Sequence, residues 1–157
     1  MKKLFEPGKI GRLELKNRII MAPMGAGGTV EPDGRLSQRG IDYYTARAKG
    51  GAGLIVTCSC RVTREFEQLP INPFVSYLTI DNKICTGWIE DLANAIHDYG
   101  AKFALQLSPG VGRTLSRQDL TRGRKPIAPS SVPCFSDPKT MTRELAPEEI
   151  ERIAGEA

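Results

Sequence analysis

Short apolar runs alternate with turn residues at the start of the chain and give way to longer apolar runs further on. Residues 3–17 separate apolar pairs by Pro-Gly and single Gly residues, a pattern that predicts a hairpin of two short strands. Apolar runs then begin near residues 18, 53 and 102. The first of them, Ile19 to Ala22, is apolar at every position, which favours a parallel strand buried on both faces, and Pro23 should end its pairing.

A helical pattern follows the first strand. Ser37 is a favourable N-cap residue, and the apolar side chains of Ile41, Tyr44 and Ala48 recur at helical spacing behind it. Gly50 and Gly51 should end this helix, because glycine is the residue most often found past a helix C-terminus.

The second helical pattern is the clearest in the chain, and Gly100 is its expected stop. Its apolar side chains fall on one face at steps of three and four residues: Ile84, Trp88, Leu92, Ala95, Ile96 and Tyr99. Pro147 opens a third helix with Glu148 and Glu149 in the first turn, where negative charge is favourable.

The order of elements is therefore a hairpin followed by three βα units, which predicts an α/β fold with a parallel sheet. Residues 108–146 form an expected loop of nearly forty residues, and loops of that length in compact domains are usually functional. Three units cannot close a barrel. We expect residues 1–157 to be the N-terminal part of a single (β/α)8 TIM-barrel domain, truncated after the third unit.

Composition adds little to this picture and excludes several classes. The chain has 157 residues, 40% apolar and 25% charged, with a net charge of +4. The chain shows no alternation of basic and aromatic residues, so nucleic-acid binding is disfavoured. No signal peptide or membrane span is expected, so a cytoplasmic enzyme is the default. Residues 113–125 carry five of the basic side chains, either as a solvated loop or as one that faces an anion.

The four cysteines do not form a metal-binding pattern. Cys58 and Cys60 are one residue apart, whereas Cys85 and Cys134 are isolated. Zinc sites use paired C-x2–4-C spacings or histidines, and the single histidine, His97, lies inside a helical pattern. We expect four reduced thiols and no metal site in this chain.

The candidate chemistry lies at the C-terminal ends of the strands, where ligands bind in barrels of this kind. Gln106 follows an apolar run and offers a donor and an acceptor side by side. If it is buried there, its carboxamide needs partners. One interpretation is a ligand edge with adjacent N–H and C=O groups, such as the pyrimidine edge of a flavin. The other is a glutamine bonded to neighbouring loop backbone.

Several segments, in this order and spacing, resemble the N-terminal part of the old yellow enzyme family, the NADH:flavin oxidoreductases. The resemblance extends over essentially the whole chain and is closest to the 2,4-dienoyl-CoA reductase and 2-enoate reductase branch. The segments that carry it are Lys3-Leu4-Phe5-Glu6-Pro7, Leu15-Lys16-Asn17-Arg18-Ile19, Met21-Ala22-Pro23-Met24, Gly53-Leu54-Ile55-Val56, Gln106-Leu107 with Gly112-Arg113, and Ala128-Pro129-Ser130.

This resemblance implies an FMN-binding barrel that uses NADH or NADPH to reduce activated C=C bonds of small α,β-unsaturated substrates. It places Pro23, Met24 and Gly25 along the isoalloxazine through main-chain contacts. Ser59 would be a further ring contact, and Gln106 would bond the pyrimidine edge. Ala128-Pro129-Ser130 resembles a loop segment that packs below the site. A homo-oligomer is expected for the full-length enzyme.

The chain also departs from the family pattern. Gly25 stands where relatives often carry a Thr or Cys that tunes the flavin, so other groups must set its potential. The usual Gln-Leu-x-His-Ala-Gly-Arg is changed to the eight residues 106–113, which leaves the role of Arg113 open. The family's substrate-anchoring pair, its proton-donating Tyr and its phosphate loops belong to later strands.

We therefore assign no catalytic residue to this chain and expect it to be inactive alone. In the reductase branch, a 4Fe-4S cluster and FAD would belong to further C-terminal parts. Two alternatives remain: a flavin-free (β/α)8 lyase or aldolase, and a non-catalytic binding fragment. The first would want a lysine or carboxylate at a strand end, and neither is found there.

Overall fold

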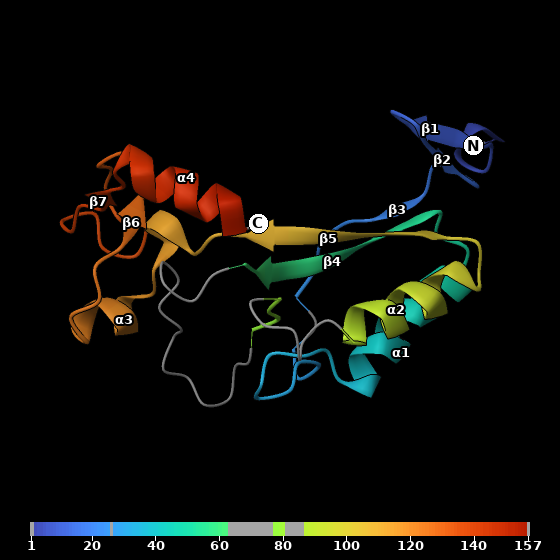
Figure 1. Cartoon of the computed structure of the whole chain (residues 1–157), viewed down its shortest axis with the longest axis horizontal. Helices are drawn as coiled ribbons and strands as arrows, with labels where there is room; N and C mark the ends of the chain where they lie inside the picture. The colour runs from blue at the N-terminus through green and yellow to red at the C-terminus, as the bar shows by residue number, and fades with distance from the viewer. Residues whose placement is uncertain (1, 26, 63–76, 81–86, 157) are drawn as a thin grey trace. The chain divides into compact units, whose positions relative to one another are not determined.

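The computed structural model describes residues 2–25, 27–62, 77–80 and 87–156 (Figure 1). The chain divides into two compact units. The first consists of Met1–Cys60 with Ser76–Gln106, and the second of Arg61–Val75 with Leu107–Ala157. The predicted hairpin and the first two βα units lie mainly in the first unit. None of the described helices has the length and apolar character needed to cross a membrane.

The N-terminal hairpin is confirmed. A 3-10 turn, η1 (Lys2–Leu4), precedes β1 (Gly8–Ile10) and β2 (Leu13–Leu15), which pair antiparallel. Gly11 in the connecting turn has a φ of 56°, a left-handed conformation that glycine adopts without steric cost.

Three strands form the main sheet in the order β3 (Ile20–Met21), β4 (Leu54–Arg61) and β5 (Lys102–Ser108). β3 and β4 are parallel, with Ile20 opposite Leu54, and Figure 1 draws β4 and β5 pointing the same way. β3 stops two residues before Pro23, as predicted. The expected burial of this strand on both faces is wrong, because Ile20 is 45% exposed.

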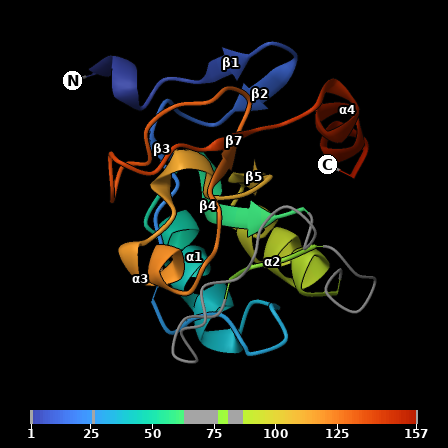
Figure 2. The same cartoon turned by 90° about the vertical axis from the view of Figure 1, so that its left-hand side faces the viewer.

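Both large helices of the first unit lie on the same side of β4 and β5 (Figures 1 and 2). α1 (Gln38–Lys49) begins at Ser37, whose side chain accepts the Gly40 N–H, and α2 is Gly87–His97. Their apolar faces and one face of the sheet form the core, which includes Met21, Ile41, Tyr44, Ala48, Ile55, Trp88, Leu92 and Ile96.

One residue assigned to the apolar face of α2 is not buried. Tyr99 is 41% exposed, because the helix ends at His97 and Gly100 (φ 66°) reverses the chain directly afterwards. Ile84, the first position of the predicted face, lies outside the described residues. The helix itself and its glycine stop are confirmed.

The second unit corrects the prediction of one long loop over residues 108–146. This segment contains η3 (Gly112–Thr114), α3 (Arg117–Thr121), β6 (Ile127–Ala128) and β7 (Arg143–Glu144), and β6 pairs with β7 in parallel. These elements are two to five residues long and are held by non-local contacts, so no periodicity announces them. α4 (Pro147–Glu156) begins at the predicted proline.

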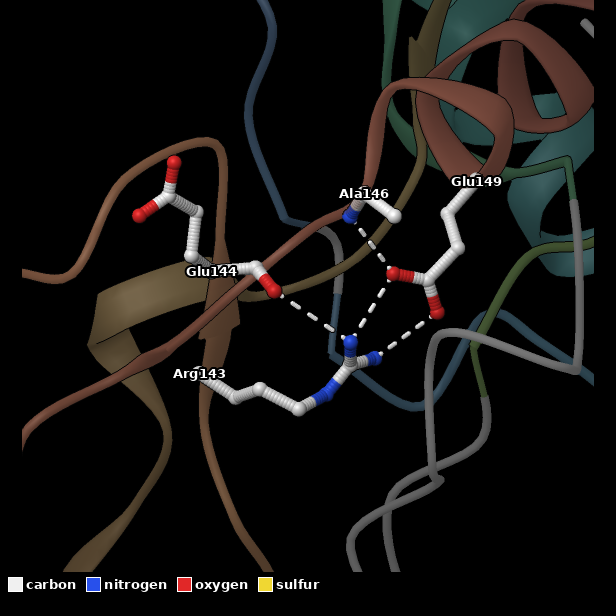
Figure 3. A network of polar contacts seen from close by, with 4 residues as sticks. All are labelled: Arg143, Glu144, Ala146 and Glu149. Atoms are coloured by element: carbon white, nitrogen blue, oxygen red, sulfur yellow. Dashed lines mark hydrogen bonds and ion pairs between the residues drawn. The ribbon is translucent and has the colours of Figure 1, made fainter.

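An ion pair fastens the start of α4 to β7 (Figure 3). The Arg143 guanidinium donates to both carboxylate oxygens of Glu149, at 2.8 and 3.0 Å. The same carboxylate accepts the Ala146 N–H at 2.8 Å, which satisfies one of the free N–H groups at the helix N-terminus. These contacts lower the pKa of Glu149 to about 2, with the Arg143 hydrogen bonds as the largest cause.

Candidate functional site

The sequence-predicted site residues lie at one edge of the main sheet, where its strands end. Pro23, Met24 and Gly25 follow the end of β3, and Ser59 and Gln106 lie near the ends of β4 and β5. All five residues belong to the first unit and all are exposed. The Gln106 N–H donates to Thr57 Oγ1 at 3.4 Å, which places Gln106 beside the part of β4 that leads to Ser59.

The two faces of the sheet differ in what covers them. Met21, Ile55 and Leu105 face α1 and α2 and pack in or against the core. Side chains alternate along a strand, so Ile20 and Gln106 lie on the opposite face, called here the open face. Both are exposed there. Gln106 is therefore directed away from the helices, toward a surface that the described residues of its unit do not cover.

A bulge in β4 brings Ser59 to the same open face. The Lys102 N–H donates to the Gly53 carbonyl, and a regular parallel ladder from that bond would make Arg61 the donor to Ser108. The donor is instead Val62, at 3.3 Å, so β4 carries one extra residue between these two hydrogen bonds.

Burial follows the same shift. Ile55 and Thr57 are fully buried, and strict alternation would put Ser59 on their face. Cys60 is the fully buried core residue instead, and Ser59 is exposed. The extra residue therefore turns the Ser59 side chain to the face that carries Gln106.

Gln106 itself corrects one part of its interpretation. We expected a buried polar tip, but the side chain is exposed, because the described helices of its unit that pack on this sheet, α1 and α2, lie on the other face. Among the described residues, its carboxamide has no hydrogen-bond partner, and only its backbone N–H is engaged. The alternative of a glutamine bonded to neighbouring loop backbone is not what these residues show. Its donor and acceptor are free for a ligand.

The backbone of the segment after β3 is accessible. A Cβ built on Gly25 meets no atom within 4 Å, and the Met24 side chain is 49% exposed. An exposed thioether and a bare main chain suit one face of a flat ring, and the Gln106 carboxamide suits a polar ring edge. The residues present therefore fit a flat heterocycle of the flavin kind.

Tyr44 is a polar contributor that sequence reasoning treated only as a core residue. Its side chain is fully buried, and its hydroxyl oxygen accepts the Cys58 N–H at 3.0 Å, directly before Ser59. Burial is the largest cause that raises the pKa of this phenol above its usual range. The signal that could have found it is the phenol itself, because a buried tyrosine hydroxyl usually has a hydrogen-bond partner.

The second unit holds the remaining predicted segments and a cavity of about 410 Å³. The basic run contributes Arg124 and Lys125 to its lining, and Arg124 lies 3.4 Å from the buried carboxylate of Asp119. Arg113 is exposed in η3, and Ala128 is buried in β6. Arg124, one of the five basic residues of this run, is thus paired within the unit.

The described cysteines, Cys58, Cys60 and Cys134, form no disulfide, and Cys85 lies outside the described residues. Within the described ranges, no three His, Cys, Asp or Glu side chains gather as a metal site would require.

Comparison with known proteins gives consistent matches over nearly the whole chain. Residues 3–156 match the model of the NADH:flavin oxidoreductase / NADH oxidase family. Cinnamate reductase of Clostridium sporogenes is 43% identical over 151 residues, covering 95% of this chain and 22% of that protein. NADH oxidase of Thermoanaerobacter brockii is 43% identical over 150 residues, covering 96% of this chain and 22% of that protein.

Among solved structures, the old yellow enzyme homologue of Zymomonas mobilis matches with a TM-score of 0.73 at 26% identity. The match covers 98% of this chain and 42% of that one. This chain thus spans about a fifth of the length of the two curated relatives above. The predicted fold, the first units of an old yellow enzyme (β/α)8 barrel, is confirmed.

Proposed function

Because this chain belongs to the NADH:flavin oxidoreductase / NADH oxidase family, we propose that it supplies part of the FMN site of an NAD(P)H-dependent ene-reductase. The observation that carries the proposal is the Gln106 carboxamide, which is exposed on the open face and has no partner among the described residues. The Ser59 side chain is turned to that same face.

Each residue would have a limited role. Gln106 would bind the polar edge of the ring through one donor and one acceptor, which fixes the orientation of the ring in its plane. Ser59 would add a hydroxyl at the neighbouring strand end. The main chain at Pro23 and Gly25 and the Met24 side chain would lie along one face of the ring and exclude water from it. FMN, when bound, would supply a two-electron carrier between a nicotinamide and carbon.

The names of the relatives support a proposal for the substrate class. The name of the Clostridium sporogenes protein, cinnamate reductase, denotes an α,β-unsaturated carboxylate substrate, and this chain is 43% identical to it over 151 residues. We propose a small activated alkene, an enoate or enoyl compound, as the substrate of the enzyme to which this chain contributes. No residue of this chain is assigned the proton transfer, so the chain alone is expected to be inactive.

The remaining parts of the proposal concern the longer enzyme. It would take NADH or NADPH as reductant, assemble as a homo-oligomer and work in the cytoplasm. If the enzyme belongs to the 2-enoate reductase branch, a 4Fe-4S cluster and FAD would be held by residues outside this chain.

An absorbance spectrum from 300 to 550 nm of the purified longer enzyme that contains this chain tests the proposal. Two bands near about 370 and 450 nm, from a cofactor identified as FMN after denaturation, are the expected result. A protein that is colourless as purified, and that develops no flavin band shift on titration with FMN, would contradict it.

A further inference from the structure

The bulge that turns Ser59 to the open face coincides with a contact made by a buried side chain. Tyr44 comes from α1 and is fully buried, and its hydroxyl oxygen accepts the Cys58 N–H at 3.0 Å. Cys58 directly follows Thr57, the last residue before the burial pattern of β4 departs from strict alternation. The contact therefore lies where the extra residue enters the strand.

The geometry of the sheet explains why Cys58 needs a side-chain acceptor. Alternate residues of β4 direct their N–H groups toward β3, beginning with Leu54, which donates to the Ile19 carbonyl. Cys58 is four residues further on, but β3 has ended at Met21 and Pro23 follows. The ladder thus runs out before it reaches Cys58. A hydroxyl from the helix layer satisfies an N–H group that the neighbouring strand no longer can.

Tyr44 is itself held firmly. Its ring belongs to the core cluster and meets the Tyr43 ring edge-on, with centroids 5.1 Å apart and planes at 84°. The Tyr43 ring is in turn covered by the Arg47 guanidinium, which lies 3.5 Å from the ring centroid. The hydroxyl therefore has a fixed position from which to hold the β4 backbone, and burial keeps it in its neutral form.

We propose that Tyr44 is a positioning residue of the candidate flavin site, because its hydroxyl holds the β4 bulge in the arrangement that presents Ser59 beside Gln106. This inference rests on the proposed FMN function. It assigns to α1, on the far side of the sheet, a role in shaping the ligand surface.

The test is the variant Tyr44→Phe, which keeps the buried ring and removes only the hydroxyl. Its matched control is Tyr43→Phe, the same change one residue earlier on α1, where no hydroxyl contact with β4 is present among the described residues. The FMN dissociation constant of the longer enzyme that contains this chain, freed of its FMN, is measured by flavin fluorescence. We expect the dissociation constant to rise about three- to tenfold for Tyr44→Phe, because one hydrogen bond that positions β4 is lost. We expect no change for the control.

Two further measurements separate positioning from general destabilisation. Ile96→Val loosens the same core from α2 without touching Cys58. Where it lowers the melting temperature as much as Tyr44→Phe does, it should still leave the FMN affinity unchanged. In a double-mutant cycle, Tyr44→Phe should add little to Ser59→Ala if Tyr44 acts through Ser59. Hydrogen exchange at the Cys58 amide of the apoprotein should become faster in Tyr44→Phe but not in Tyr43→Phe or Ile96→Val.

The outcomes distinguish the two proposals. If Ser59→Ala weakens FMN binding while Tyr44→Phe does not, or if the two effects simply add, the positioning role is overturned and the flavin site stands. If neither Ser59→Ala nor Gln106→Leu changes FMN affinity, both proposals fall together.

Discussion

Replacing Gln106 by leucine removes one carboxamide from the open face and leaves the rest of the first unit unchanged. The size of the effect can be worked out for the free and the bound protein separately. Because the carboxamide has no partner among the described residues and is exposed, its loss should change the free energy of unfolding of the apoprotein by less than about 0.5 kcal/mol.

Bound FMN should register the change much more strongly. The ring edge loses one donor and one acceptor, each worth about 0.5–1.5 kcal/mol, for a total of about 1–3 kcal/mol. At 1.4 kcal/mol for each factor of ten, the dissociation constant should rise about tenfold, within a range of roughly five- to a hundredfold. Gln106→Glu keeps the shape and the acceptors but loses the amide donor, so it should weaken binding as well.

The assay combines an FMN fluorescence titration with a urea melt of each apoprotein. Gln118→Leu is the matched control, because Gln118 is an exposed glutamine of α3, outside the candidate site. An unchanged dissociation constant and an unchanged flavin band shape in Gln106→Leu would refute the assignment. A loss of apoprotein stability well above 1 kcal/mol would refute the premise that the carboxamide is uncommitted.

Two further predictions concern stability. Asn17 is buried, donates to the Gly51 carbonyl at 2.7 Å and accepts the Ile19 N–H at 3.1 Å, so Asn17→Ala should lower the free energy of unfolding by about 1–3 kcal/mol in urea melts. Asn94→Ala, at an exposed asparagine, serves as control. Equal effects of the two substitutions would contradict a stabilising role for the Asn17 hydrogen bonds. The Arg143 hydrogen bonds, with the Ala146 N–H, lower the pKa of Glu149 from 4.5 to about 2. The stabilisation is therefore complete above pH 4.5 and is lost as the pH falls toward 2. The melting midpoints of wild type and Glu149→Gln should therefore differ most above about pH 5 and converge near pH 2, whereas Glu148→Gln, in the same turn, should follow wild type throughout; parallel profiles for the two variants would refute the linkage.

The elements that sequence analysis located are those with local signals. α1 has a serine cap, a row of apolar residues at helical spacing and terminal glycines, and each of these works through contacts within a few residues. α4 was found from Pro147 and its acidic first turn. In α2, the expected burial of Tyr99 was wrong, because periodicity does not show that the last turn has already ended.

The second unit shows what such signals miss. β6 and β7 pair over two residues each, with more than a dozen residues of chain between them, and a two-residue strand has no period to detect. α3 did carry a signal that could have been used. Ser116 accepts the Asp119 N–H at 3.1 Å, and Ser-x-x-Asp is the spacing of an N-terminal cap.

At Ser59, the burial expected from strand alternation differs from the exposure in the structure. The resemblance to the family named this residue, but the alternation of β4 from Ile55 through Thr57 would bury it against the helices. A bulge explains why Ser59 is exposed despite this alternation. A bulge adds one residue to a strand without a characteristic sequence pattern that would predict it. The cause lies outside the strand: β3 ends at Met21, and the Tyr44 hydroxyl takes the N–H group that β3 no longer reaches. Information about the candidate site is therefore carried in part by a core tyrosine, and a change there should alter the ligand surface without touching any residue that lines it.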